Sequence, residues 1–398
     1  MAARKCILFF AEAVTLAHVT RPLTLAQSLS SAHYDVHFAC AEGFDFIFPK
    51  DSNITRWHIN SIPSEQFIKA LANGARFYNK KTLINYINED IALIDKIKPD
   101  IIVGDFRLSL AISAPISSTP YIALANAHWS PYSRKNYPLP NHPLTKLIGY
   151  TLTNFFFQLI RPLIFNYHAL PHKQLRKLHK LKPPTDLRQA YTYGDHTLYL
   201  DVPELIPIQN LPSNHHFIGS LLWSPDIPLP DWFKTLDQNK KNIYVTLGSS
   251  GAADKLPKII SILSKLNVNI LIATAGRSDI TTSKNIYVAD YLPGVEVIRK
   301  CDLVVCNGGS ATAYQALSEG VPILGIASNM DQYLTMSYIV KAGVGCLVRS
   351  ENIKKMAINK ATRTLLENSE VKKAASTMKV AFHKRDACDR FKKIIDNL

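Results

Sequence analysis

Short apolar runs that alternate with longer amphipathic stretches constrain the fold of this chain more than any other feature of its sequence. In the first half the apolar runs have the length of buried strands, at residues 5–10, 36–39, 54–59, 100–103 and 121–124. Helical spacing marks stretches between them, such as residues 22–30 and 81–97. Strands that alternate with helices in this way predict a parallel sheet covered on both faces.

The pattern breaks near the middle of the chain and then begins again. Residues 215–230 are rich in proline, which opposes regular structure, so we expect a linker there. A second series of strand-like runs follows, at residues 242–247, 269–273, 286–288, 303–306 and 322–326. We therefore predict an α/β protein with two doubly wound domains, residues 1–222 and 241–380, joined by a linker at 223–240. The cleft between two such domains is the default place for a ligand.

The charge balance indicates an anionic partner without identifying it. The 398 residues include 46 Lys and Arg against 31 Asp and Glu, a formal net charge of +15. Nucleic acid, an anionic membrane surface and phosphate-bearing small molecules all fit this excess. Nucleic acid is disfavoured, because the basic residues are dispersed instead of clustering with aromatic residues. The six cysteines form no Cys-x-x-Cys pair, so we expect reduced thiols and no metal site.

Two apolar segments are candidates for membrane or targeting elements. The run at residues 6–10 is too short for a signal peptide, and a first core strand explains it better. Residues 147–170 are interrupted too often for a transmembrane helix. A buried helix, the wall of an acceptor pocket and a membrane-surface patch remain open for this segment. We expect a cytoplasmic protein, and peripheral contact with an anionic inner membrane face stays open.

Two turns that follow buried strands have the composition of anion sites. In the first, Asn307-Gly308-Gly309-Ser310 leads into a helix that also carries Thr312. Glycines let a ligand approach the backbone, and hydroxyls with free N–H groups at a helix start suit a diphosphate. In the second, Gly248-Ser249-Ser250 follows the first strand of the second half, without the Gly-Lys-Ser/Thr ending of a P-loop. Ordinary turns with serine caps are the alternative for both.

Three further positions suggest the handling of a polyhydroxy substrate. Asp331-Gln332 can exchange several hydrogen bonds with sugar hydroxyls, although such a pair is also common at a helix start. His18 follows the first strand and could act as a general base. Asp105 ends a neighbouring strand and could orient the imidazole of His18. Structural roles for both residues are the alternative.

These motifs together resemble a known superfamily. Residues 16–22, Leu-Ala-His-Val-Thr-Arg-Pro, resemble the Gly-His-x-x-Pro segment of the UDP-glycosyltransferase-like superfamily of macrolide-glycosyltransferase type, with one extra residue before the proline. Residues 288–344 resemble its nucleotide-sugar signature in order and spacing. The resemblance implies the GT-B fold, with two Rossmann-like domains facing a cleft and a C-terminal helix, residues 381–398, that returns to the first domain. It also implies inverting transfer of a hexosyl group, without metal or cofactor, from a UDP-sugar to a hydroxyl of a small-molecule or lipid acceptor.

The resemblance also assigns roles to individual residues. His18 would be the base and Asp105 its partner. The donor-binding set would be Gly248, Ser249, Ser250, Val288, Leu292, Asn307, Gly308, Gly309, Ser310, Thr312, Gln315, Asp331 and Gln332. The acceptor side would include Asn126, His128 and Trp129. An epimerase or hydrolase of the same fold is an alternative, and so is a non-catalytic nucleotide-sugar-binding homologue. Asn307 keeps the latter open, because it stands where the family usually has a histidine.

Overall fold

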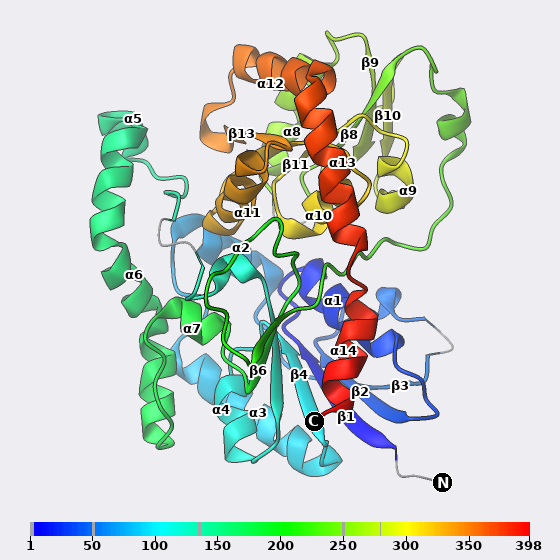
Figure 1. Ribbon diagram of the computed structural model, residues 1–398. Helices are drawn as coiled ribbons and strands as arrows, with labels where there is room; N and C mark the ends of the chain where they lie inside the picture. The colour runs from blue at the N-terminus through cyan, green and yellow to red at the C-terminus, as the bar shows by residue number, and fades with distance from the viewer. Residues whose placement is uncertain (1–3, 50–51, 134–136, 249–250, 279) are drawn as a thin grey trace. The chain divides into compact units, whose positions relative to one another are not determined.

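The chain divides into two compact units. A computed structural model describes residues 4–49, 52–133, 137–248, 251–278 and 280–398 (Figure 1). The first unit comprises Met1–Lys135, Phe155–Leu221 and Arg385–Leu398, and the second comprises Asn136–Asn154 and Leu222–Lys384. Each unit has its own parallel sheet, of seven and six strands respectively. The prediction of two doubly wound α/β domains is confirmed.

The sheet of the first unit has the strand order β3-β2-β1-β4-β5-β6-β7. Its strands are β1 Lys5–Ala11, β2 Tyr34–Cys40, β3 Ile54–His58, β4 Ile101–Asp105, β5 Tyr121–Ala125, β6 His196–Tyr199 and β7 His215–Phe217. The direction of winding changes between β1 and β4, where Ala11 pairs with Asp105. The carboxyl ends of these two strands therefore form the switch point at which open α/β sheets bind ligands.

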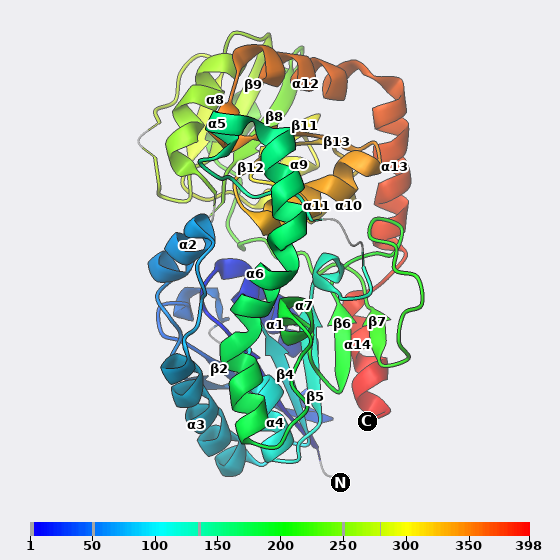
Figure 2. The same ribbon diagram turned by 90° about the vertical axis from the view of Figure 1, so that its left-hand side faces the viewer.

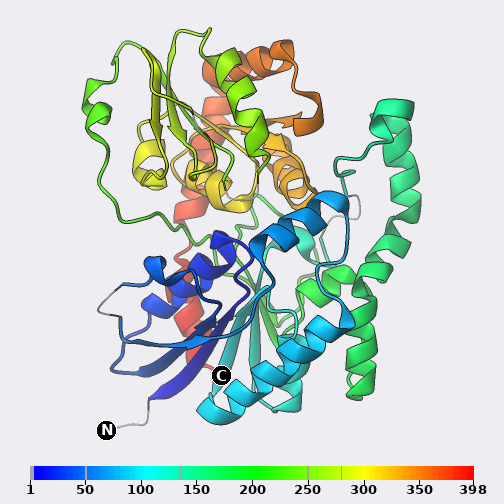
Figure 3. The same cartoon turned by 180° about the vertical axis from the view of Figure 1, so that it is seen from behind.

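Helices cover both faces of this sheet (Figures 1 and 3). They are α1 Leu16–Gln27, α2 Ser64–Asn73, α3 Lys80–Ile97, α4 Leu110–Ile116, α6 Tyr150–Leu178, α7 Leu187–Tyr191 and α14 Ala387–Asp396. Side chains alternate along β1, so Leu8 and Phe10 join one core cluster with α3 and α4. Phe9 faces the other way and meets Phe391 of α14, with ring centroids 6.0 Å apart.

Two sequence predictions about the first unit are wrong in detail. The helix expected from residue 22 begins at Leu16, with Thr15 as an extended N-cap, and Pro22 lies inside it. The missing N–H of Pro22 costs one hydrogen bond, to the carbonyl of His18 four residues earlier, and the helix continues past it. The predicted linker region 215–230 begins with β7, which forms because Thr197–Tyr199 of β6 offers a partner strand.

The sheet of the second unit has the order β10-β9-β8-β11-β12-β13. Its strands are β8 Lys241–Thr246, β9 Val268–Ala273, β10 Ile286–Ala289, β11 Leu303–Cys306, β12 Ile323–Ala327 and β13 Gly345–Arg349. Its α-helices are α5 Thr145–Ile148, α8 Leu256–Leu263, α9 Gly294–Ile298, α10 Ser310–Ser318, α11 Met330–Lys341, α12 Lys355–Glu367 and α13 Ser369–His383. Thr246 of β8 pairs with Cys306 of β11, which brings together the two turns after these strands. Short 3-10 helices complete the chain, at Asp45–Ile47, Ala127–Trp129, Asp231–Thr235, Ala253–Lys255 and Ser350–Asn352.

The segment Asn136–Asn154 groups with the second unit, whereas the sequence placed it in a first domain of residues 1–222. Arg349 of β13 explains the grouping, because its guanidinium donates to the carbonyls of Leu139 at 3.0 Å and Pro140 at 3.1 Å. Asn141 adds a bond to Ser350 at 2.9 Å. Among the described residues, no helix combines the length and the apolar character needed to cross a bilayer.

Candidate active site

His18 and Asp105 meet at the switch point of the first sheet. Asp105 is the last residue of β4 and is fully buried, and His18 lies in the first turn of α1 with its side chain 19% exposed. His18 Nδ1 lies 2.7 Å from Asp105 Oδ1. Arg21 Nη2 also lies 2.9 Å from this Nδ1, but it already donates to Asp105 Oδ1 at 2.6 Å. An ionised carboxylate only accepts hydrogen bonds, so we assign the proton to Nδ1 because the shorter contact with Asp105 would otherwise join two acceptors. The lone pair of the imidazole is then on Nε2, the state that a general base requires.

Arg21 is a third member of this site that the sequence did not predict. Its Nε donates to Asp105 Oδ2 at 2.9 Å and its Nη2 to Asp105 Oδ1 at 2.6 Å. Burial alone would raise the pKa of Asp105, but the charge of Arg21 and the bond from His18 outweigh it and lower that pKa. Asp105 is therefore ionised at neutral pH. The sequence spacing could have predicted Arg21, because it follows His18 by three residues and therefore lies on the same face of the helix.

An aromatic wall lines the site beside His18. Phe106 has a left-handed backbone, with φ 57°, and its ring stacks on His18 at 4.7 Å between centroids. Phe67 and Tyr191 meet Phe106 edge to face, at 5.8 and 5.3 Å. Trp129 extends the wall, 5.2 Å from Tyr191. These four residues, Phe67, Phe106, Trp129 and Tyr191, are called the aromatic wall below, and they suit an apolar or aromatic ligand.

The three predicted acceptor residues are placed differently from one another. Asn126 belongs to the polar side of the site, because its Oδ1 accepts from Arg21 Nη1 at 2.8 Å. Its Nδ2 donates to Asp201 Oδ1 at 3.1 Å, so its amide orients Arg21. Trp129 is half-buried in the aromatic wall, and His128 is almost fully buried. Asn126 and Trp129 therefore come together with His18.

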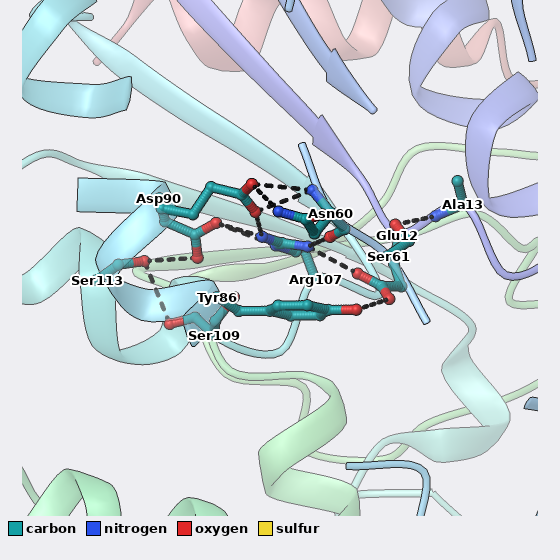
Figure 4. Close-up of polar contacts among 10 residues, drawn as sticks. Glu12, Ala13, Asn60, Ser61, Tyr86, Asp90, Arg107, Ser109 and Ser113 are labelled. Carbon is teal, nitrogen blue, oxygen red and sulfur yellow. Dashed lines mark hydrogen bonds and ion pairs between the residues drawn. The ribbon is translucent and has the colours of Figure 1, made fainter. Parts of the chain in front are cut away.

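A buried charge network adjoins the end of β4 (Figure 4). Arg107 is fully buried and donates to Glu12 at 3.1 Å, to Asp90 at 3.0 Å and to Glu89 at 2.9 Å. Burial raises the pKa of both Glu12 and Asp90, although the charge of Arg107 opposes the shift. The backbone N–H of Glu12 also donates to the carbonyl of Asp105 at 3.1 Å. The network therefore anchors the chain on either side of Phe106.

The turn after β11 has the predicted form of an anion site in the second unit. Asn307 is buried, and its Oδ1 accepts from the N–H of Gly309 at 3.0 Å. Gly308 has φ 79°, and a Cβ there would lie 2.5 Å from Cγ of Met336, so only glycine fits. Helix α10 then begins at Ser310, and its N-cap has no side-chain hydrogen bond. Its first N–H groups are suited to an anion.

The rest of the predicted donor set lies on neighbouring elements. Gly248 follows β8 with φ 59°, and Ser249 and Ser250 lie outside the described residues. Gln315 of α10 donates to the carbonyl of Trp223 at 2.6 Å, which gives its amide a structural partner. The remaining positions lie in four places: Val288 in β10, Leu292 in the turn before α9, Thr312 in α10, and Asp331 with Gln332 in the first turn of α11.

Gln332 has an unused donor. Its Oε1 accepts from the N–H of Ser328 at 2.8 Å and from its hydroxyl at 3.0 Å. Its Nε2 is buried and has no hydrogen-bond partner among the described residues. Its backbone carbonyl lies 3.5 Å from the position of a Cβ on Gly308, so α11 borders the glycine turn. A buried donor without a partner, next to a glycine turn of this form, makes Gln332 a candidate ligand contact.

One group of possible metal ligands occurs in the described part of the chain: Cys6, Asp35 and His37. Trp57 Nε1 lies 3.0 Å from His37 Nδ1 and can only donate, so Nδ1 is the acceptor. His37 Nε2 then carries the proton, 3.5 Å from Asp35. Burial also raises the pKa of Cys6 to about 11. These residues do not fit a metal, since neither nitrogen nor sulfur offers a ready lone pair.

Comparisons with known proteins identify the family of this chain. A family model, "Erythromycin biosynthesis protein CIII-like, C-terminal domain", matches residues 258–386. A "PGL/p-HBAD biosynthesis glycosyltransferase" of Mycobacterium tuberculosis is 43% identical over 96% of this chain and 90% of its own length. A "PGL/p-HBAD biosynthesis rhamnosyltransferase" of Mycobacterium bovis is 44% identical, over 96% of this chain and 85% of its own. The chain belongs to this family of glycosyltransferases.

The fold of this glycosyltransferase is that of solved relatives. The spinosyn rhamnosyltransferase SpnG, complexed with thymidine diphosphate, aligns with a TM-score of 0.69 at 15% identity. The alignment covers 98% of this chain and 99% of SpnG. The predicted resemblance and the prediction of a glycosyltransferase are both confirmed. The matched region 258–386 includes the glycine turn and Gln332.

Proposed function

We propose that this glycosyltransferase moves a hexosyl group from a pyrimidine nucleoside diphosphate sugar to a hydroxyl of an apolar acceptor, with inversion and without a metal ion. The observation that carries the proposal is the His18–Asp105–Arg21 arrangement beside the aromatic wall. It combines a base with a surface for an apolar molecule. A nucleophilic hydroxyl on such a molecule is the acceptor that this chemistry suits.

The proton path follows from the hydrogen bonds of His18. Its Nε2 takes the proton of the acceptor hydroxyl as the new glycosidic bond forms. The ionised Asp105 holds Nδ1–H and stabilises the imidazolium that results. Arg21 keeps Asp105 ionised and fixes its two oxygens. General-base help of this kind contributes about 10²–10⁴-fold to the rate.

The leaving group is a nucleoside diphosphate that gains negative charge as the sugar departs. Backbone N–H groups at the start of α10 suit that charge. Asn307 is neutral, so stabilisation comes from dipoles and not from a cation. Asp331 and the unused Nε2 of Gln332 suit the hydroxyls of the donor sugar.

His18→Ala tests the proposed base. We expect transfer to fall about 10²–10⁴-fold, while the donor still raises the melting temperature. His33→Ala, at an exposed histidine of the same unit, is the matched control and should keep full activity. Turnover retained in His18→Ala would exclude His18 as the base. Donor consumption that needs no acceptor would identify a hydrolase instead.

The donor nucleotide can be tested separately by thermal shift. The sequence favoured a UDP-sugar, while a relative is named a rhamnosyltransferase and SpnG is complexed with thymidine diphosphate. We therefore compare the rise in melting temperature that dTDP-rhamnose, UDP-glucose and GDP-mannose each cause. A donor at about 100 times its Kd stabilises by about 2.7 kcal/mol, which corresponds to about 5–11 °C. A larger shift with the guanosine donor would overturn the pyrimidine assignment.

A further inference from the structure

Helix α6 is apolar on two opposite sides, and the protein covers one of them (Figure 2). The covered side includes Phe157, Phe165 and Ala169, all buried. The other side, called the α6 apolar face below, carries six large side chains that are 50–71% exposed. They are Phe155, Phe156, Leu159, Ile160, Leu163 and Tyr167. Their spacing of three and four residues places them on one stripe of the helix.

The chain around this face is strongly basic. Residues 106–185 contain ten Lys and Arg and no Asp or Glu, a formal charge of +10 out of the net +15. Arg107 is one of the ten, but it is buried and paired with acidic residues, so it adds no charge at this face. Lys177 lies near the C-terminal end of α6 and Lys180 lies just past it. Both lysines are exposed. Arg76 lies over the ring of Tyr167, 3.5 Å from its centroid. The apolar face therefore has cations beside it and no acidic residue in its stretch of chain.

We propose that the α6 apolar face docks in the interface of an anionic lipid bilayer. Soluble monomers rarely expose an apolar stripe of this size without a partner. A helix that joins exposed Phe, Leu and Ile to lysines matches the composition of interfacial membrane helices. Phosphate headgroups complement Lys177 and Lys180. A second copy of this chain does not complement them, because an isologous contact would bring two acid-free, basic stretches together.

The position of α6 connects docking to the proposed function, on which this step rests. Phe165, on the covered side of α6, lies 6.5 Å from Trp129 of the aromatic wall. The same helix therefore faces the aromatic wall on one side and the membrane on the other. This arrangement would let an acceptor dissolved in the bilayer reach the wall with little exposure to water. The acceptor class is then a lipid-soluble alcohol.

Vesicle co-sedimentation without donor or acceptor tests the docking itself. We expect the protein to bind phosphatidylcholine vesicles that contain about one third phosphatidylglycerol, and to bind more weakly in high salt. The triple variant Phe155→Ser, Leu159→Ser and Leu163→Ser should bind about 100-fold more weakly, or about fivefold per side chain. Its melting curve in the absence of vesicles should keep a single folded baseline. Binding that survives the three substitutions would overturn the proposal.

A matched control removes three exposed apolar side chains elsewhere. Phe46→Ser, Met356→Ser and Val380→Ser alter residues that are 72%, 84% and 67% exposed, and vesicle binding should remain unchanged. An equal loss in this control would show that the α6 apolar face is not the contact.

Two further experiments, with lysine variants and on the oligomeric state, distinguish docking on anionic lipid from the alternatives. Lys177→Gln with Lys180→Gln should weaken binding to anionic vesicles by about fivefold per lysine, and should not affect neutral vesicles. Sedimentation velocity tests whether a second copy of this chain covers the α6 apolar face instead of a bilayer. A wild-type dimer that the triple serine variant dissociates, together with no vesicle binding, would overturn the proposal in favour of a second copy. The thermal shift caused by the donor is measured in parallel. Loss of vesicle binding with the donor shift retained would count against docking alone, and not against the transferase assignment.

Discussion

Replacing Arg107 with methionine should destabilise the first unit and make its stability strongly dependent on pH. The five N–H groups of a guanidinium all have partners here: Glu12, Asp90, Glu89 and the carbonyl of Asn60. Glu12 and Asp90 are fully buried, so the substitution leaves two carboxylates without their cation. Removing one partner of a buried ion pair costs about 3–5 kcal/mol. For a domain of this size that corresponds to a fall in Tm of about 6–20 °C.

The sign of the pH dependence follows from the two carboxyl groups. Burial already raises their pKa in the native protein, and loss of Arg107 raises it further. A native state with raised pKa values binds protons that the unfolded chain releases above about pH 4. The contribution of Glu12 and Asp90 to the stability of the variant is therefore greatest at low pH and is lost as the pH rises. The difference in Tm from the wild type should be largest near about pH 8 and shrink toward about pH 5.

Thermal unfolding followed by tryptophan fluorescence measures this effect. A Trp223→Phe/Trp232→Phe background leaves Trp57 and Trp129, both in the first unit, as reporters. Combining Glu12→Gln and Asp90→Asn with Arg107→Met removes the unpaired charges, so it should recover part of the lost Tm and remove most of its pH dependence. A variant within about 2 °C of the wild type near pH 8, or a difference that grows as the pH falls, would refute the reasoning.

Three further perturbations test the two sites. Arg21→Met should raise the pKa of Asp105, since Arg21 helps to lower it, so the acidic limb of the pH–rate profile should move to higher pH; an unchanged limb would contradict this role. Gly308→Ala should lower Tm and abolish the donor thermal shift, whereas Gly276→Ala, also at positive φ but in open space, should keep the shift. Asp331→Ala should weaken binding of the intact sugar nucleotide more than binding of the free diphosphate, as calorimetry would show; equal weakening would argue against a sugar contact.

The alternation of strands and helices could be predicted from periodicity for ten of the thirteen described strands, because burial imposes it residue by residue. The strands β6, β7 and β13 were not predicted. The His18–Asp105 pair could also be predicted, since parallel strands bring their carboxyl ends to one edge. Arg21 was missed because the helix was expected to start at Pro22, which hid the shared helix face.

Long-range pairings lie beyond such reasoning. Arg107 bonds to Glu12, which lies 95 positions earlier in the chain, so no local sequence pattern predicts this network. The grouping of residues 136–154 with the second unit depends on Arg349, about 210 positions further along the chain, as its bond to Leu139 shows.

The return of the chain to the first unit has a consequence for its synthesis. Phe9 is covered by Phe391, and Lys5 donates to the carbonyl of Ile395 at 2.8 Å. A ribosome that adds about 5–20 residues per second needs about 20–80 s between these two phenylalanines. One face of β1 therefore stays uncovered until all the residues between Phe9 and Phe391 have been synthesised. The second unit ends at Lys384, before the Arg385–Leu398 segment of the first unit, so it can complete its core before the first unit does.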